Sequence, residues 1–210
     1  MFLADGLLQS FLFGLTLAAA VGPIALLIVN YGISQGFRAA FAAGCGAAVA
    51  DLLYAMLAFI AGAQLLAWLA DKQDEFRRLS SLVLILLGLW MLWRAWAHHA
   101  TQKPVAGAAT ATTTAGATRP FLTTLLLTIV NPLTVLVFVG FAGQLPLGGS
   151  LRVAAMLALA VFAGSLMVQT AFALGGAALA RVLSNPRWQR LLNGLSGAAV
   201  AAFGFHGMWQ

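Results

Sequence analysis

Residues 37–68 read FRAAFAAGCGAAVADLLYAMLAFIAGAQLLAW, an apolar run whose charged side chains are those of Arg38 and Asp51. A helix crosses the hydrocarbon core of a bilayer with about 20 residues at a rise of about 1.5 Å each. The run is longer than that, and its many Gly and Ala residues are typical of membrane helices that pack closely together. We therefore expect a transmembrane helix here.

Apolar runs of this kind recur along almost the whole chain, which is 62% hydrophobic and 8% charged. So few polar side chains cannot cover a water-facing globule, and we expect lipid around the protein. Backbone polar groups in lipid must be satisfied within the segment, which favours helices. The predicted fold is all-α and polytopic, with about six transmembrane helices. The predicted spans are 7–31, 37–68, 79–96, 121–141, 151–174 and 188–209.

The net charge of +6 comes from Lys and Arg residues that stand in short clusters between the apolar runs. This distribution is typical of membrane topology, and it does not predict a nucleic-acid partner. More of the bases fall on the side of the first, third and fifth connections. Because cytoplasmic loops carry the excess of bases, we expect residues 97–119 in the cytoplasm and both termini outside. Those residues, rich in Ala, Thr and Gly, predict a flexible linker.

The linker separates two segments, 1–96 and 120–210, that share one plan. Val21-Gly22-Pro23 in the first segment matches Val130-Asn131-Pro132 in the second, and a small-residue run follows each. Since each segment has three predicted spans, the second must enter the bilayer from the opposite side. Inverted repeats with interrupted helices at matching positions indicate secondary transporters, whose substrate site lies near the midplane.

The two prolines are candidate site residues because of what they do to a helix. Pro23 and Pro132 would each remove a backbone hydrogen bond and free polar groups inside the membrane. Such groups can bind an ion or a substrate where they face a cavity. Gly22 permits a sharp break, and Asn131 adds an amide that both donates and accepts. The alternative is a pair of ordinary kinks used for packing.

Asp51 is the sharpest single candidate. An ionised carboxylate at the centre of a membrane helix costs roughly 2.5–3.5 kcal/mol on insertion scales. At helical spacing Asp51 shares a face with Gly44, Ala47, Ala48 and Tyr54, so we expect it to point into the bundle. There it could carry a proton or pair with a substrate ammonium group. The alternative is a structural aspartate that bonds a broken helix.

Ser165 and Gln169 are the polar candidates of the second half. If Arg38 and Arg152 are equivalent, the position thirteen residues on is Asp51 in one half and Ser165 in the other. Gln169 follows Ser165 by one turn, on the same face. The two side chains could bind a substrate or join neighbouring helices, and the pattern leaves both readings open.

Metal, cofactor and catalytic chemistry find little support in the sequence. Cys45 is the one cysteine, which excludes disulfide frameworks and thiolate metal cages. The adjacent pair His98-His99 lacks the further ligands that a metal needs. We therefore predict no cofactor, no metal site and no catalytic residues, and the chain is not expected to be an enzyme.

Several short motifs resemble the LysE family of amino-acid exporters. They are Ala20-Val-Gly-Pro-Ile24, Gly32 and Gly36, Asp51, Asn131-Pro132 and the run from Gly176 to Pro186. The resemblance implies a six-helix efflux carrier of the bacterial inner membrane for basic or neutral amino acids, driven by the membrane potential or by ion exchange. Many members have Pro-Gly-Pro where this chain has Val21-Gly22-Pro23. The basic-amino-acid branch tends to lack the first proline, which favours lysine or arginine.

The expected partners are then an amino-acid substrate, membrane lipid and a coupling ion such as a proton, with a homodimer left open. Three alternatives share the architecture: export of another small solute, export of a metal cation, or a membrane assembly subunit without transport. The single acid Asp51 supplies one negative charge, whereas a dibasic substrate carries two positively charged groups, so the substrate is left open as well.

Overall fold

All secondary structure in the described part of the chain is helical, as the sequence predicts. The computed structural model describes residues 2–20, 23–68, 73–97, 117–131, 134, 137–138, 140–141 and 150–209. The predicted linker residues 98–116, the motif residues Gly22 and Pro132, and the pair His98-His99 lie outside these ranges. The helices are α1 (Phe2–Ala19), α2 (Pro23–Gln35), α3 (Phe37–Trp68), α4 (Gln73–Ala97), α5 (Thr118–Ile129), α7 (Leu151–Ser184) and α8 (Pro186–Met208).

Among the described residues, three helices contain a stretch that is long and apolar enough to cross a membrane. These stretches are Phe37–Ala61 in α3, Arg78–Ala97 in α4 and Leu151–Gly176 in α7. They match three of the predicted spans. The predicted span 7–31 is instead a bent pair, α1 and α2, which meet at 69° and count as a fourth crossing if taken together. The total of six remains a prediction.

The first bend falls where the sequence places Val21-Gly22-Pro23. Pro23 is the first residue of α2, a position where a proline loses no helical hydrogen bond because the first N–H groups of a helix have no internal partner. One helix therefore ends at Ala19 and the next begins at Pro23, which is a stronger break than a kink.

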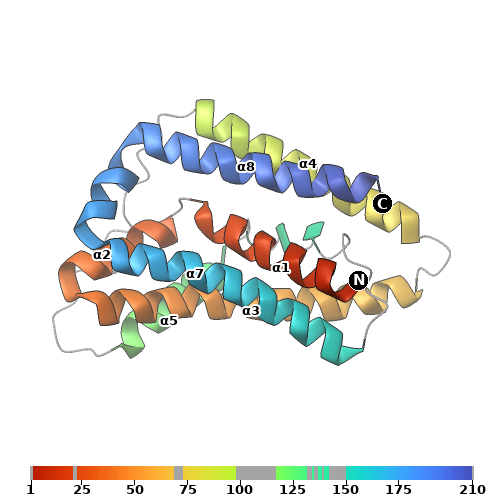
Figure 1. The fold of residues 1–210 in the computed structure, drawn as a ribbon, viewed down its shortest axis with the longest axis horizontal. Coiled ribbons are helices and arrows are strands. Elements are labelled where there is room, and N and C mark those ends of the chain that lie inside the picture. Colours follow the sequence, from red (N-terminus) through yellow and green to blue (C-terminus); the bar gives the residue numbers. More distant parts are fainter. Residues whose placement is uncertain are drawn as a thin grey trace.

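Two layers make up the bundle (Figure 1). Helices α4 and α8 lie side by side and form one layer, and α1, α2, α3, α5 and α7 form the other. The α4–α8 contact is close because glycines face it. A Cβ added to Gly88 would lie 2.5 Å from the backbone nitrogen of Ala201, and one added to Gly204 would lie 2.7 Å from the carbonyl oxygen of Ser81. Large apolar side chains such as Leu57, Leu126 and Leu174 are exposed on the outside, as a lipid-facing surface requires.

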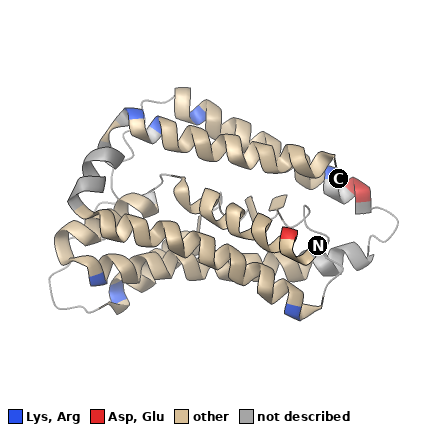
Figure 2. Cartoon of the chain, viewed as in Figure 1, with Lys and Arg blue, Asp and Glu red and all other residues tan. Residues whose placement is uncertain are grey.

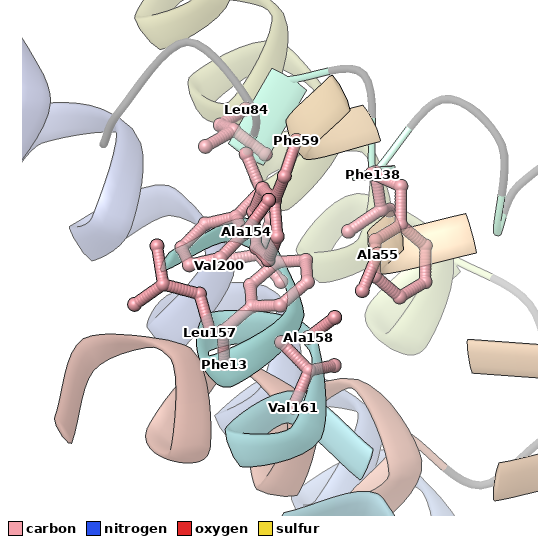
Figure 3. Close-up of a cluster of buried hydrophobic side chains, with 12 residues drawn as sticks. Phe13, Ala55, Phe59, Leu84, Phe138, Ala154, Leu157, Ala158, Val161 and Val200 are labelled. Carbon is pink, nitrogen blue, oxygen red and sulfur yellow. The ribbon is translucent and has the colours of Figure 1, made fainter. Parts of the chain in front are cut away.

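Two hydrophobic clusters fill the interior of the bundle. We call the first the aromatic core (Figure 3); it contains Phe13, Ala55, Phe59, Leu84, Val137, Phe138, Phe141, Ala154, Leu157, Ala158, Val161 and Val200. We call the second the alanine-rich core; it contains Ala25, Leu27, Ile28, Val29, Tyr31, Ala39, Ala40, Ala43, Phe172 and Ala173. Along α3 and α7, residues of one core end before those of the other begin.

The two halves of the chain pack on each other in a crossed pattern. Helix α1 packs on α7, and α5 packs on α3, so the first helix of each half lies against a long helix of the other half. The closest backbone contacts of the α1–α7 pair match those of the α3–α5 pair. A Cβ added to Gly164 would overlap the carbonyl oxygen of Phe11, and one added to Gly46 would overlap the carbonyl oxygen of Phe121.

One turn further along α1 and α5, a second pair of contacts occupies matching positions. Gly14 of α1 lies against the carbonyl of Val161 in α7. Thr124 of α5 lies against the carbonyl of Ala43 in α3 and donates a hydrogen bond to it at 2.5 Å. The residue contacted on the long helix lies three positions before the close-packed glycine in both cases. Val161 precedes Gly164, and Ala43 precedes Gly46. This correspondence supports the proposal of a structural repeat that comprises 1–96 and 120–210.

Candidate functional site

Asp51 lies inside the bundle, as its face on the helix predicts. It is 4% exposed, and the alanines around it on α3, Ala47, Ala48, Ala50 and Ala55, are buried as well. Small side chains let α5 and α7 approach α3 closely on this side. The same approach removes the carboxylate from lipid, so the expectation that Asp51 points inward is confirmed.

Asp51 and Ser165 meet across the α3–α7 contact. The hydroxyl of Ser165 donates a hydrogen bond to Oδ2 of Asp51 at 2.6 Å, and Ser165 is fully buried. The sequence placed these residues at related positions of two repeats without predicting a contact. A carboxylate that accepts a short hydrogen bond is better stabilised in its charged form than a bare one, so Ser165 offsets part of the burial of Asp51.

The pair lies between the two hydrophobic cores. On α3, Ala43 belongs to the alanine-rich core and Ala55 to the aromatic core, and Asp51 falls between them. On α7, Val161 belongs to the aromatic core and Phe172 to the alanine-rich core, with Ser165 between. The hydrogen-bonded pair is thus enclosed by apolar packing on both sides along the bundle.

Gln169 adds a second polar group to the same face of α7. It is 5% exposed, and its Oε1 has no hydrogen-bond partner in the part of the chain that the structure describes. A Cβ added to Gly44 of α3 would lie 3.1 Å from Cβ of Gln169, so the glycine makes room for this residue. Gln169 therefore lies at the α3–α7 contact, and its role in substrate binding stays a prediction.

Tyr54 ties the acid-bearing face of α3 to the end of α5. Its hydroxyl donates a hydrogen bond to the carbonyl oxygen of Ile129, the last residue of α5. Helix ends leave carbonyl groups without internal partners, and Tyr54 satisfies one of them. The next residues are Val130 and the candidate Asn131, whose backbone N–H donates to the carbonyl of Thr128 at 3.2 Å. Tyr54 thus connects the end of α5 to the turn of α3 that carries Asp51.

Two threonines of α5 face α3. Thr124 is held by its hydrogen bond to Ala43, whereas the hydroxyl of Thr128, 5% exposed, has no partner among the described residues. From the sequence alone, Thr128 has a weaker claim to a site than Ser165 and Gln169. The signal that favours it is spacing: Thr124, Thr128 and Asn131 are four and three residues apart and would share one face of a continuous helix.

Positive charge in the described ranges lies away from this site. The Lys and Arg residues lie toward the two ends of the bundle (Figure 2). Arg38, Arg119 and Arg152 are in the first turns of α3, α5 and α7, and Arg94 is in the last turn of α4. The same part of the chain contains no group of three or more His, Cys, Asp or Glu residues that could hold a metal ion. The site therefore consists of one acid with neutral hydrogen-bonding groups.

A family model described as LysE type translocator matches residues 15–210. The chain belongs to the LysE type translocator family. Members of this family are transporters, so this LysE-type protein is a solute efflux transporter of the membrane. The match is to the family as a whole, and the lysine and arginine branch stays a prediction. Neither curated proteins nor solved structures gave a match to this chain.

Asp51 and Ser165 come from different segments of the chain, 1–96 and 120–210, so the buried acid lies at a contact between the two segments. Gly22 and Pro132 lie outside the described residues, and Pro23 has been placed at the start of α2.

Proposed function

We propose that this LysE-type protein exports amino acids across the bacterial inner membrane, with the carboxylate of Asp51 as the group that binds the substrate's ammonium or a coupling proton. Basic amino acids such as lysine and arginine are favoured by the resemblance of the first motif, and neutral amino acids are the alternative. The observation that carries the proposal is the Asp51–Ser165 hydrogen bond between the two cores.

Energetics support a role for Asp51 beyond structure. An ionised carboxylate at mid-membrane costs roughly 2.5–3.5 kcal/mol on insertion scales, and a hydrogen bond to a charged group contributes about 1.5–3 kcal/mol. One hydroxyl therefore offsets part of the penalty. A carboxylate has about four acceptor sites, of which Ser165 occupies one. A proton or a substrate ammonium group would offset the remainder, and an export cycle needs such exchangeable occupancy.

The crossed packing of the halves suggests how the site would open. We propose that α1 with α7 forms one moving unit and α3 with α5 the other, because the closest backbone contacts lie within these pairs, at Gly164 and Gly46. The α3–α7 contact would then be the interface that shears. Alternating access by such rocking exposes one site to each side in turn. The Asp51–Ser165 hydrogen bond spans that interface, so it would report which state is populated.

Purified protein in liposomes tests the proposal. Vesicles loaded with labelled lysine, arginine or a neutral amino acid should release label faster than protein-free vesicles, and Asp51→Asn should abolish the difference. Asp5→Asn is the matched control, because Asp5 is an exposed acid in the first turn of α1. Wild-type vesicles that release none of these amino acids would refute the amino-acid assignment. Undiminished efflux by Asp51→Asn would refute the role of the acid.

A further inference from the structure

On the two helices that flank α3, two buried polar groups have no hydrogen-bond partner in the described ranges: Oε1 of Gln169 in α7 and Oγ1 of Thr128 in α5. Native structures rarely leave buried polar atoms unpaired, because a group removed from water without a new hydrogen bond destabilises the fold. Both atoms are acceptors, and they come from different helices, α7 and α5. Two unpaired acceptors on the helices that flank the acid-bearing helix α3 need an explanation.

The position of Thr128 follows from the two contacts that fix α5 on α3. One turn before Thr128, Thr124 is bonded to the carbonyl of Ala43. One residue after it, the carbonyl of Ile129 is bonded to Tyr54. Thr128 therefore lies against the part of α3 between residues 43 and 54, which includes Asp51.

Gln169 lies against α3 in the same interval from the other side. Its Cβ and backbone are next to Gly44, and its neighbour Ser165, one turn earlier, is bonded to Asp51. Between the two flanking helices α3 presents Ala47 and Ala50, both buried and both small. Helix α2 also packs on α3, α5 and α7.

We infer that Asp51, Gln169 and Thr128 form an acceptor site for a primary ammonium group, so that the transporter recognises its substrate by the amine and not by the carboxylate. The inference rests on the proposed function and names the substrate group that the site would bind. An ammonium group has three N–H donors and one positive charge. The site offers one carboxylate, one amide oxygen and one hydroxyl oxygen, which match it in number and charge.

A substrate carboxylate would need donors or a positive charge instead. The Lys and Arg residues that the structure describes lie toward the helix ends (Figure 2). The hydroxyl of Ser165 is already donated to Asp51. The hydroxyl of Thr128 and the amide nitrogen of Gln169 can donate, but they lie on the helices that flank the Asp51 carboxylate, which repels a second carboxylate. Compounds that keep the amine and lose the carboxylate, such as amino-acid amides, should therefore bind, and N-acetyl amino acids should not.

Ligand-dependent thermal stability of the purified protein in detergent tests this without requiring transport. A ligand that binds only the folded state raises the melting temperature, and the stabilisation grows as RT ln(1 + [L]/Kd). An amino-acid amide should stabilise the wild-type protein at concentrations within about threefold of those needed for the free amino acid. The N-acetyl derivative should give no shift at a hundredfold higher concentration.

Thr128→Val and Gln169→Met test the two neutral acceptors. Each should weaken binding of the amide by about tenfold to a hundredfold, the range expected when a hydrogen bond to a charged group is lost. Each should leave the melting temperature without ligand unchanged or slightly higher, because an unpaired polar atom is removed. Thr170→Val is the control, since the Thr170 hydroxyl is bonded to Leu166 within its own helix.

The outcomes separate this inference from the proposed function. Stabilisation by the N-acetyl compound but not by the amide would overturn the inference even if wild-type vesicles export amino acids. Unchanged affinity in both variants would also overturn it and would indicate that the two acceptors bind water. Stabilisation by amides without any efflux would sustain the ammonium site and refute the amino-acid export.

Discussion

Ser165 of α7 donates a 2.6 Å hydrogen bond to Asp51 of α3, so the acid of one half of the chain is held by a hydroxyl of the other. Helices α3 and α7 are also two of the three helices that each contain a stretch long and apolar enough to cross a membrane without a break. The contact therefore couples the charge state of the acid to the packing of the two longest helices in the described structure.

Ser165→Ala should slow efflux by about tenfold to a hundredfold, because loss of a hydrogen bond to a charged group removes about 1.5–3 kcal/mol from the state in which Asp51 is ionised. The measurement is the initial rate of release from loaded vesicles. The effect of Ser165→Ala should depend on the presence of the Asp51 carboxylate. In an Asp51→Asn background the second change should have a smaller effect on thermal stability than it has alone, and simple additivity would show that the two residues act independently.

Gly46→Ala and Gly164→Ala should both destabilise the protein, and by similar amounts. An added Cβ would overlap the carbonyl of Phe121 in one case and of Phe11 in the other. Overpacking of this kind costs about 1–3 kcal/mol, and a shift of about 2–4 °C per kcal/mol is expected for a protein of this size. The measurement is the melting temperature in detergent.

The control for these variants is Gly194→Ala in α8. No heavy atom lies within 4 Å of a Cβ added at Gly194, and Ala is favoured over Gly inside a helix by about 0.5–1 kcal/mol. That variant should be neutral or slightly stabilised. A large loss of stability in only one of Gly46→Ala and Gly164→Ala would contradict the equivalence of the α3–α5 and α1–α7 contacts.

The sequence was sufficient for the parts of this structure that follow from lipid and from periodicity. Apolar length predicted the stretches in α3, α4 and α7, and the small-residue face of 37–68 predicted the inward direction of Asp51. The bend between α1 and α2 was predicted as an interruption but was assigned to one span. A proline after a glycine indicates a break, and the size of the bend depends on contacts of α2 that lie far away in the sequence.

The partners at the site could not be derived in the same way. The alignment on Arg38 and Arg152 makes Asp51 equivalent to Ser165. The matched glycine contacts at Gly46 and Gly164 differ from that alignment by four residues, one helical turn. Apolar segments tolerate such a shift because each turn presents a similar surface. Helix crossings fix the register, and the bond from Tyr54 to Ile129 is equally a product of tertiary packing.

Phe13→Ala should lower thermal stability by about 3–5 kcal/mol, the range for removal of a buried aromatic side chain. The Phe13 ring stacks on Phe141 at 3.7 Å between centroids and meets Phe138 and Phe203 edge to face at 5.4 and 5.9 Å. The phenylalanine Phe205, about half exposed, provides the control, and its replacement by alanine should change stability little. Equal effects of the two variants would mean that the aromatic core does not hold the bundle together.

Tyr54→Phe should slow transport several-fold while the fold survives. The change removes the hydroxyl that bonds Ile129 and keeps the ring, which stacks on Phe138 with centroids 5.7 Å apart. A neutral hydrogen bond contributes about 0.5–1.5 kcal/mol, so the melting temperature should fall by a few degrees at most. The rate of transport should fall more than stability does, because the end of α5 beside Asn131 loses its hydrogen bond to the helix turn that carries Asp51.

Phe138→Leu is the complementary variant, since it weakens the stacking and leaves the Tyr54 hydroxyl in place. It should lower stability more than Tyr54→Phe does and should slow transport less. Equal loss of transport and stability in both variants would show that Tyr54 serves packing alone.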